Sequence, residues 1–408
     1  MRVTLPIDAA LRDEHVLAAD PPLAPVADTW RRRINAFQGR ALGHRALSAE
    51  QAANAGLQRL RGRSVTAGVI EGLDPVPETS ALGAAPAEAW LRLPAGSGLA
   101  RSGEDLRIPA DRRVALGSLP IWARADLLDA IAEGAPPPAP PAPGPEDPAF
   151  PGLRPPLPRR LGPALSEALE APAAAALPRA AVLVLEPTTV AILAEAAHDC
   201  PPDPRNDPYD DLQLIDGARL ALAFWPAEML AGDGGADYGP VPAGGLKRNA
   251  LAHRIFAMER RLGPRGAHPW EGLGLPLALL GFAPDWSLEF VDRAAVRRIG
   301  GAPAPRTPMV AGQGAAPLWQ AQVAQFAEHL ADLPELTAEA FAAAFRTLPP
   351  VGGLPRDAID VAARRSRLFP ASARISLRPA PAGEIDLAVA ESAPLAPLRL
   401  DVAETLEV

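Results

Sequence analysis

Proline limits what this chain can fold into more than any other residue type. The sequence has 50 prolines among 408 residues. A proline inside a helix or a central strand removes a backbone donor and clashes with its surroundings. Because 48% of the residues are hydrophobic, cores of reasonable size still form. We therefore expect an α+β, β-rich fold, with several small modules of short strands and a few amphipathic helices, joined by a Pro-rich linker.

The prolines are densest in one stretch, which marks a boundary. Between Gly134 and Ala164 the chain holds 13 of the 50 prolines. Such a sequence favours extended polyproline II, a semi-rigid spacer that advances about 3.1 Å per residue. We predict a linker at 135–163 that separates two folded regions.

Before the linker, the pattern predicts an extended N-terminal arm at 1–27, then a helical hairpin with a small β module at 28–134. Trp30, Ile34 and Phe37 share one helical face. Ser48 and Gln51 form a capping-box pattern that opens a second helix. Short runs of strand character follow, and a short helix closes the module. These runs are SVTAGVIEGL, AWLRLPAG, DLRIPA and RRVALGSLPIW, and the closing helix covers Ala123–Glu133.

After the linker, the pattern predicts a β-rich α+β domain at 164–310, a helical segment at 311–370, and extended C-terminal strands or an arm at 371–408. A helix from Leu246 to Leu262 ends at Gly263. Two more helices follow at 4-3-4-3 spacing. The strands are AAVLVLEPTTVAIL, ARLALAFWP, LPLALLGF and WSLEFVD, and the later helices carry Trp319, Val323, Phe326, Leu330 and Leu333, then Phe341, Phe345 and Leu348.

Charge and cysteine usage bound the function. The net charge of −8 lacks the basic balance of a nucleic-acid binder. Short arginine runs, Arg31–Arg33 and Arg364–Arg367, are expected to be solvated faces or pairing sites for the excess carboxylates. The single cysteine, Cys200, cannot form an intramolecular disulfide. No secretory signal or membrane-spanning run is apparent, so we expect cytoplasmic synthesis and assembly.

Motifs of catalysis are not recognisable in the chain. Phosphate-binding, nucleophile-elbow and zinc-protease patterns are all missing, and the Gly-rich AGSGL at Ala95–Leu99 is interpreted as a turn between strands. Gly272–Leu275 is followed by Pro276 and cannot open a Rossmann helix. The prediction is a non-enzyme with no catalytic, cofactor-binding or metal residues and no cofactor.

Other possible site residues have simpler structural explanations. Consecutive His198, Asp199 and Cys200 cannot easily adopt nucleophile–base geometry, so a structural cysteine is the preferred interpretation. The acidic loop Asp203–Asp211 with Asp216 could hold calcium, but it lacks the EF-hand glycine, and the question stays open. The helical histidines His253 and His329 are expected at the surface or its boundary.

One group of residues supports an alternative function. Trp270 and Trp286, with Asp285 and Glu289, could line a carbohydrate pocket, although core packing explains the tryptophans as well. The alternative is a particle-borne carbohydrate-binding module or glycan-acting enzyme.

Segments that cover about a third of the chain resemble phage tail and baseplate proteins. The first consists of Val65–Leu73, Leu91–Gly98 and Gly103–Ile108, which resemble a strand–turn–strand module. The second resembles a strand-ending signature, and the third, PPVGGLPRDAID to EIDLAV near the C-terminus, is similar to proteins of contractile injection systems. The second signature's matching residues are Pro276, Leu277, Ala278, Asp292, Val296 and Arg297.

The resemblance implies a structural, non-catalytic component of a baseplate or tail region. Its partners would be other subunits of a large particle, namely baseplate, tube, spike or fibre proteins, without nucleic acid or a membrane span. Arms at both ends would add strands to neighbours. A scaffold protein unrelated to phage remains a further alternative.

Overall fold

The computed structural model describes 3–5, 16–18, 44–139, 145, 156–193, 212–229, 238–263, 266–301, 316–333, 340 and 343–345. The chain divides into two compact units. Unit 1 comprises Met1–Ser64 with Ser102–Glu104, and unit 2 comprises Val65–Arg101 with Asp105–Val408.

Unit 1 contains one long helix and a short strand pair. Helix α1 spans His44–Gly62, so it includes the predicted start at Ser48 and begins a turn earlier. Strands β1 (Val3–Leu5) and β2 (Val16–Ala18) pair antiparallel. The described parts of the predicted N-terminal arm therefore pair with each other. The predicted helix around Trp30 lies outside the described residues.

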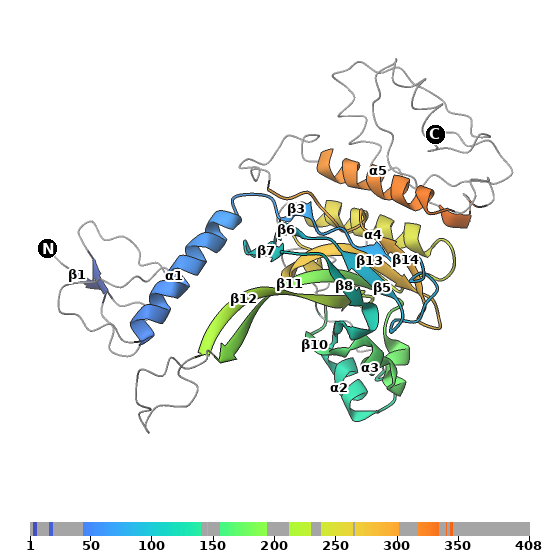
Figure 1. Ribbon diagram of the computed structural model, residues 1–408, viewed down its shortest axis with the longest axis horizontal. Coiled ribbons are helices and arrows are strands. Elements are labelled where there is room, and N and C mark those ends of the chain that lie inside the picture. The colour runs from blue at the N-terminus through green and yellow to red at the C-terminus, as the bar shows by residue number, and fades with distance from the viewer. Residues whose placement is uncertain are drawn as a thin grey trace, which may run out of the picture. The chain divides into compact units, whose positions relative to one another are not determined.

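Unit 2 is built on a six-stranded mixed sheet with the order β10-β9-β12-β11-β13-β14 (Figure 1). All neighbours are antiparallel except β9 and β12. The bounds are β9 Pro120–Arg124, β10 Arg159–Ala164, β11 Ala180–Leu193, β12 Leu212–Phe224, β13 Leu275–Phe282 and β14 Leu288–Asp292. Helices and strands of this mixture confirm the α+β class.

One face of the sheet packs against helix α4, which spans Lys247–Leu262. Its apolar stripe forms a core with alternate residues of the central strands, such as Val182 and Val184 of β11. The helix stops at Gly263, whose φ of 59° is a backbone conformation that glycine adopts without strain. Helix α5 (Ala316–Ala331) lies against α4 (Figure 1). Both helices agree with the predicted ones.

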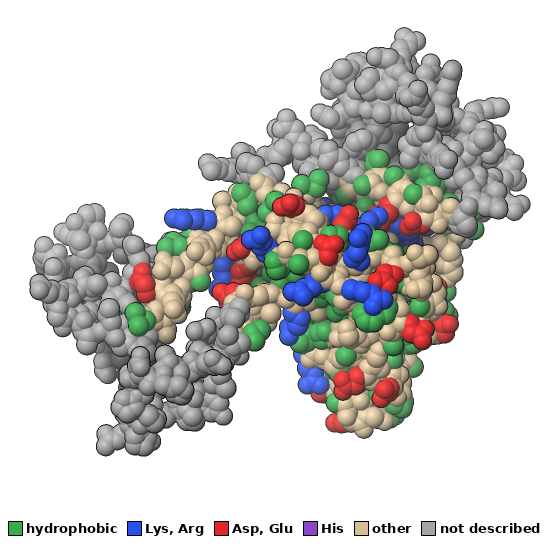
Figure 2. Space-filling model, in the orientation of Figure 1, with side chains coloured by type: hydrophobic (Ala, Val, Ile, Leu, Met, Phe, Trp, Pro, Cys, Tyr) green, Lys and Arg blue, Asp and Glu red, His purple; other side chains and the backbone are tan. Residues whose placement is uncertain are grey.

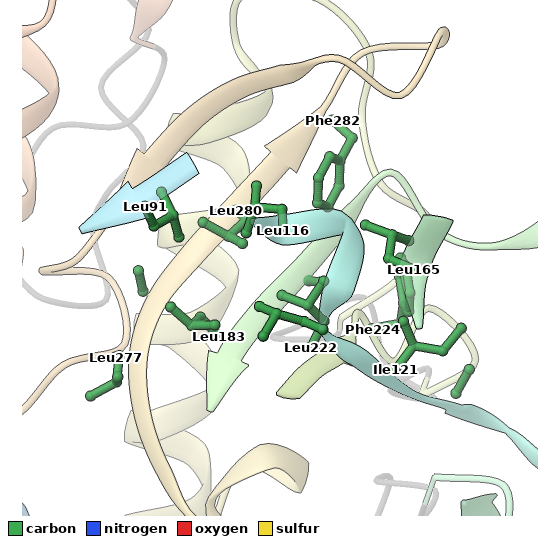
Figure 3. Close-up of a cluster of buried hydrophobic side chains, with 14 of the residues drawn as sticks. Leu91, Leu116, Ile121, Leu165, Leu183, Leu222, Phe224, Leu277, Leu280 and Phe282 are labelled. Carbon is green, nitrogen blue, oxygen red and sulfur yellow. The ribbon is translucent and has the colours of Figure 1, made fainter. Parts of the chain in front are cut away.

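The opposite face of the sheet is covered by two small sheets and short helices. The buried side chains here are mostly leucines from distant parts of the chain, for example Leu91, Leu165 and Leu280 (Figure 3). The sheets are ordered β3-β6-β7 and β4-β5-β8. The bounds are β3 Gly68–Gly72, β4 Val76–Pro77, β5 Trp90–Leu93, β6 Gly96–Leu99, β7 Asp105–Ile108 and β8 Arg112–Ala115; the helices are α2 Ala125–Glu133, α3 Leu165–Leu169, η2 Leu116–Ser118 and η3 Pro172–Ala176.

The glycine-rich segment at Ala95–Leu99 is a strand, not the predicted turn. Residues Gly96–Leu99 form β6, the centre of its sheet. A Cβ on Gly96 would lie 2.2 Å from the Glu71 carbonyl oxygen, and one on Gly98 would lie 2.4 Å from the Leu275 side chain. Gly96 is therefore required by the close approach of neighbouring backbone, and a side chain at Gly98 would displace the end of Leu275; turn-based sequence interpretation overlooks both contacts.

The predicted linker differs from the structure at its C-terminal end. Arg159–Ala164 forms β10, which pairs with β9 at the edge of the large sheet. No regular element is assigned at 135–139. Because β9 precedes the Pro-rich stretch, β10 lies at its C-terminal end and β11 to β14 follow it, the regions predicted on either side of the linker share one sheet and one core.

The C-terminal third is described only in part. Of the third predicted helix, helical backbone is described at 340 and 343–344, and Phe345 is buried. The C-terminal strands predicted at 371–408 lie outside the described residues.

Candidate functional site

The residues of the proposed carbohydrate pocket do not converge. Trp270 is 2% exposed and stacks on His268 and Trp225 in the core on the α4 side. Trp286 packs on the opposite core, beneath the Arg179 guanidinium at 3.6 Å. Glu289 pairs with Lys247 at 2.8 Å. Both tryptophans belong to the framework, so the carbohydrate alternative is not supported.

Asp285 and Trp286 form the tight β13–β14 turn instead. The Asp285 carboxylate accepts hydrogen bonds from the backbone N–H and the hydroxyl of Ser287 at 3.0 and 2.7 Å. Trp286 has φ of 71°, which is strained for a bulky side chain. Its contacts with Arg179, Phe224 and Phe282 hold it there.

The other candidates fall in different places. His198, Asp199 and Cys200, and the acidic segment Asp203–Asp211, lie outside the described residues. Asp216, the last acid of that predicted loop, lies instead in strand β12. Within the described chain, no group of three or more potential metal ligands occurs. His253 is half-buried, as predicted for a boundary residue. His329 is only 5% exposed, so the prediction of a surface or boundary position is wrong; the reason is that Phe345 covers its ring at 4.4 Å.

The residues of the second phage-tail signature have structural contacts, and the similar C-terminal segment lies outside the described residues. Pro276, Leu277 and Ala278 are buried in β13. Val296 is 4% exposed. Arg297 donates to the Asp74 carboxylate at 2.6 Å and to the Gly72 carbonyl at 2.7 Å. These contacts clamp the β3–β4 turn.

Asp292 belongs to a buried ionic network that sequence reasoning missed. Its carboxylate is fully buried and accepts a bond from Arg248 Nε at 2.7 Å. Gln325 donates to the same oxygen at 2.7 Å, and the Ala295 N–H donates to the other oxygen at 2.9 Å. Arg248 also reaches Asp332 at 2.6 Å. One carboxylate thus ties α4, α5 and the end of β14 together.

A second layer of ion pairs extends this network toward the β3–β4 turn. Glu328 of α5 accepts from Arg293 Nε at 2.9 Å and from the Arg293 backbone N–H at 3.1 Å. Arg293 also lies 3.8 Å from Asp74. Nearby, Arg298 pairs with Glu259 of α4. This arrangement fixes helices α4 and α5 to the sheet.

A buried tyrosine–histidine pair forms the centre of the aromatic cluster. The Tyr238 hydroxyl bonds His268 Nδ1, and the Trp225 indole donates to the Tyr238 and Gly239 carbonyls at 2.9 Å. Burial lowers the pKa of His268 to about 3, and the charge of Arg298 adds to that effect. Burial likewise raises the pKa of Tyr238 well above its usual value. Both groups are neutral at physiological pH, as a structural pair requires.

An open depression lies along strand β4. It measures 730 Å³ and is lined by Val76, Pro77, Glu78, Thr79, Ser80 and Arg92. Glu78 is engaged by Arg113 in a two-pronged pair at 2.6 and 2.9 Å, which lowers the pKa of that carboxyl. The depression can take a polar or anionic surface group at Arg92. Over the face shown in Figure 2, charged side chains of both signs are spread.

The feature best suited to bind another protein is the outer half of the β11–β12 hairpin, called here the ribbon. Eight register pairs, Glu186↔Arg219 through Leu193↔Leu212, continue beyond the sheet. Strand β13 pairs with β11 only over Ala180–Leu185, and β9 meets β12 only at Leu222 and Ala223. Among described strands, the ribbon residues therefore pair only with each other, and Figure 1 shows the ribbon projecting.

Glu186 anchors the ribbon where it leaves the sheet. Its carboxylate, 4% exposed, accepts from the Trp122 indole and from Arg219 at 2.7 Å. On the other ribbon face, the Thr189 hydroxyl donates to Asp216 at 2.9 Å. Val190 is 51% exposed. The base of the ribbon is thus held firmly, while its outer part offers backbone groups and an apolar side chain to a partner.

Comparison with known proteins gives no family for this chain. No protein-family model matches it, and no curated protein matches it. A solved structure described as the crystal structure of TssK matches 89% of this chain and 68% of that chain, at 13% identity and a TM-score of 0.23. A score of this size does not establish a common fold. In the part of the chain that the structure describes, no helix is long and apolar enough to cross a membrane.

Proposed function

We propose that this protein is a structural component of a phage-tail-like assembly, in its baseplate or tail region, where it docks to and bridges neighbouring subunits without catalysis. The ribbon carries this proposal. A projecting pair of strands with two open edges is a template for strand addition, in which main-chain hydrogen bonds supply affinity and alternate side chains supply specificity.

The ionic network supports the same role. A subunit that transmits load between neighbours needs its elements fixed to one another, and Asp292 fixes two helices and a strand through three separate donors. The segments that resemble phage tail proteins run through this framework, at Pro276–Ala278 and Asp292–Arg297. The proposal includes synthesis and assembly in the cytoplasm, with other particle subunits as partners.

The direct test is particle membership. In the native host, the gene is deleted or replaced by a tagged copy, and particles are purified by sedimentation and viewed by electron microscopy. We expect the tagged chain to sediment with tail-like particles and the deletion to give incomplete ones. A tagged copy that lacks residues 1–27 serves as the matched variant, and we expect it to fold but not to restore assembly. Normal particles from the deletion strain, with the tagged chain left in the supernatant, would contradict the proposal.

A further inference from the structure

The outer edge of β12 is the more accessible edge of the ribbon. On this side of β12, strand β9 pairs with Leu222 and Ala223 only. From Leu212 to Ala221, no described strand pairs with β12 on the same side. β11 contains Pro187, which has no N–H, whereas β12 has no proline. The donors of β12 are therefore uninterrupted. Soluble proteins usually protect such edges with charge, proline or a covering element.

The two faces of the ribbon differ in character. Val190 lies on one face, opposite Ile215 in register, and is half-exposed. Asp216 lies on the other face, opposite Thr189. Within the described residues, no cation pairs with Asp216. The 18 connecting residues 194–211 add six acids against one arginine by sequence. A strand that adds here should therefore present apolar side chains on the face that carries Val190 and basic side chains on the face that carries Asp216.

The chain itself contains a segment with this pattern, outside the described residues. Residues 364–378 hold five arginines and no acid. Within them, Ala373, Ile375 and Leu377 alternate with Arg374, Ser376 and Arg378. In an extended strand, alternate residues face opposite sides, so this hexapeptide has one apolar and one basic face. Both match the faces of the ribbon.

We propose that residues 373–378 of a second copy of this chain add as a third strand to the outer edge of β12, with Arg374 and Arg378 on the face that carries Asp216 and the apolar residues on the face that carries Val190. This inference rests on the proposed function for its choice of a second copy, since bridging requires contacts between chains. The test uses purified full-length chain in the absence of particles. A negative result would therefore contradict this contact but not the proposed membership of a particle, which the particle experiment tests separately.

Photo-crosslinking tests the contact. Chain with Val190→p-benzoyl-phenylalanine is mixed with isotope-labelled chain that lacks the probe, irradiated, digested and mapped by mass spectrometry. We expect crosslinks from position 190 of the unlabelled chain to labelled residues 371–380. The same probe at Leu82, which is 51% exposed on the turn after β4, is the matched control and should not label that segment.

Charge reversal provides the second measurement. Asp216→Arg in the probe chain should lower the crosslink yield by up to about fivefold, the upper limit for one exposed ion pair. Arg374→Asp with Arg378→Asp in the labelled chain should restore it. Circular dichroism and thermal melting verify that the Asp216→Arg chain is folded. We expect it to fold, because the side chain of Asp216 contacts the exposed Thr189. The proposal is overturned by crosslinks only within one chain, by no crosslinks to residues 371–380, or by yields indifferent to both charge changes.

Discussion

Arg248 and Asp292 form a salt bridge in the interior, with Arg248 Nε 2.7 Å from Asp292 Oδ2 and side chains only 4% and 0% exposed. Burial opposes the charged form of Arg248, but Asp292 and Asp332 keep its pKa above its ordinary value. An ion pair removed from water must be fully hydrogen-bonded to persist. The Asp292 carboxylate meets that condition through Gln325 and the Ala295 N–H, whereas Arg248 Nη2 is buried without a hydrogen-bond partner and lies 3.7 Å from Glu328. The pair therefore specifies how α4, α5 and β14 meet.

Removing the carboxylate should be costly. Asp292→Ala leaves Arg248 buried with only peripheral partners, and we expect the unfolding free energy to fall by about 3–5 kcal/mol. Chemical denaturation measures it. Asp332→Ala is the matched control, because Asp332 is 57% exposed and its pair with Arg248 should contribute no more than about 1 kcal/mol. Equal losses in the two variants would show that Asp292 is not the centre of the network.

Sequence periodicity predicted the elements with a strong local pattern. Helix α4 has its apolar stripe and a glycine stop, so both its ends agree with expectation. The long strand β11 is rich in β-branched and aliphatic residues and was predicted over its whole length, whereas β12 was predicted only from Ala218, because the prediction assigned Asp216 to an acidic loop. In β6 the pattern failed, because Gly96 and Gly98 are selected by neighbours that a local pattern does not contain.

Pairings between distant segments could not be predicted. The parallel contact of β9 with β12 joins Ile121 to Leu222, across the Pro-rich stretch that suggested a domain boundary. Likewise, Asp292 bonds Arg248 and Gln325, which lie 44 and 33 positions away from it in the sequence. One signal was available: Arg248 occupies the same helical stripe as Leu251 and Ile255, where a charge needs a buried partner. The sequence does not say which carboxylate that partner is.

Acid should destabilise the protein partly through His329. Burial and the nearby Arg248 charge lower the pKa of His329 from 6.5 to about 3. His329 binds a proton more readily in the unfolded chain than in the folded protein. The contribution of neutral His329 to the unfolding free energy is therefore complete above about pH 6.5. It falls by about 1.4 kcal/mol per pH unit as the pH falls toward about 3.

The variant that isolates this effect is His329→Leu. At pH 7.5 we expect the unfolding free energy to change by no more than about 1 kcal/mol. The leucine fills a similar space beside Phe345, and it removes a buried nitrogen, Nδ1, that has no hydrogen-bond partner. At pH 4.5 the variant should gain stability relative to the parent. Urea denaturation at both pH values measures the difference. A difference that does not change with pH would refute the assignment.

Glu186 should control the order of the ribbon more than the stability of the whole protein. Glu186→Ala leaves the Trp122 indole N–H without its acceptor and frees Arg219, at a cost of about 1–3 kcal/mol. Hydrogen exchange should accelerate at 186–193 and 212–219 and stay unchanged in α4. Glu186→Gln retains an acceptor for Trp122, so its exchange rates should lie between those of the parent protein and those of Glu186→Ala. Uniform acceleration across the sheet would show that Glu186 supports the whole core instead.

Lys247 should act as a built-in reporter of unfolding. It is the only lysine in the chain, is 4% exposed, and donates to the Phe282 carbonyl and to Glu289 at 2.8 Å. An amine-acylating reagent should therefore modify only the α-amino group of the native protein. In urea it should also modify Lys247. The lysine introduced by Ile299→Lys, at a position 84% exposed, is the matched control and should react at once. If Lys247 of the folded protein reacted as fast as that control, the start of α4 would not be packed against β13 and β14.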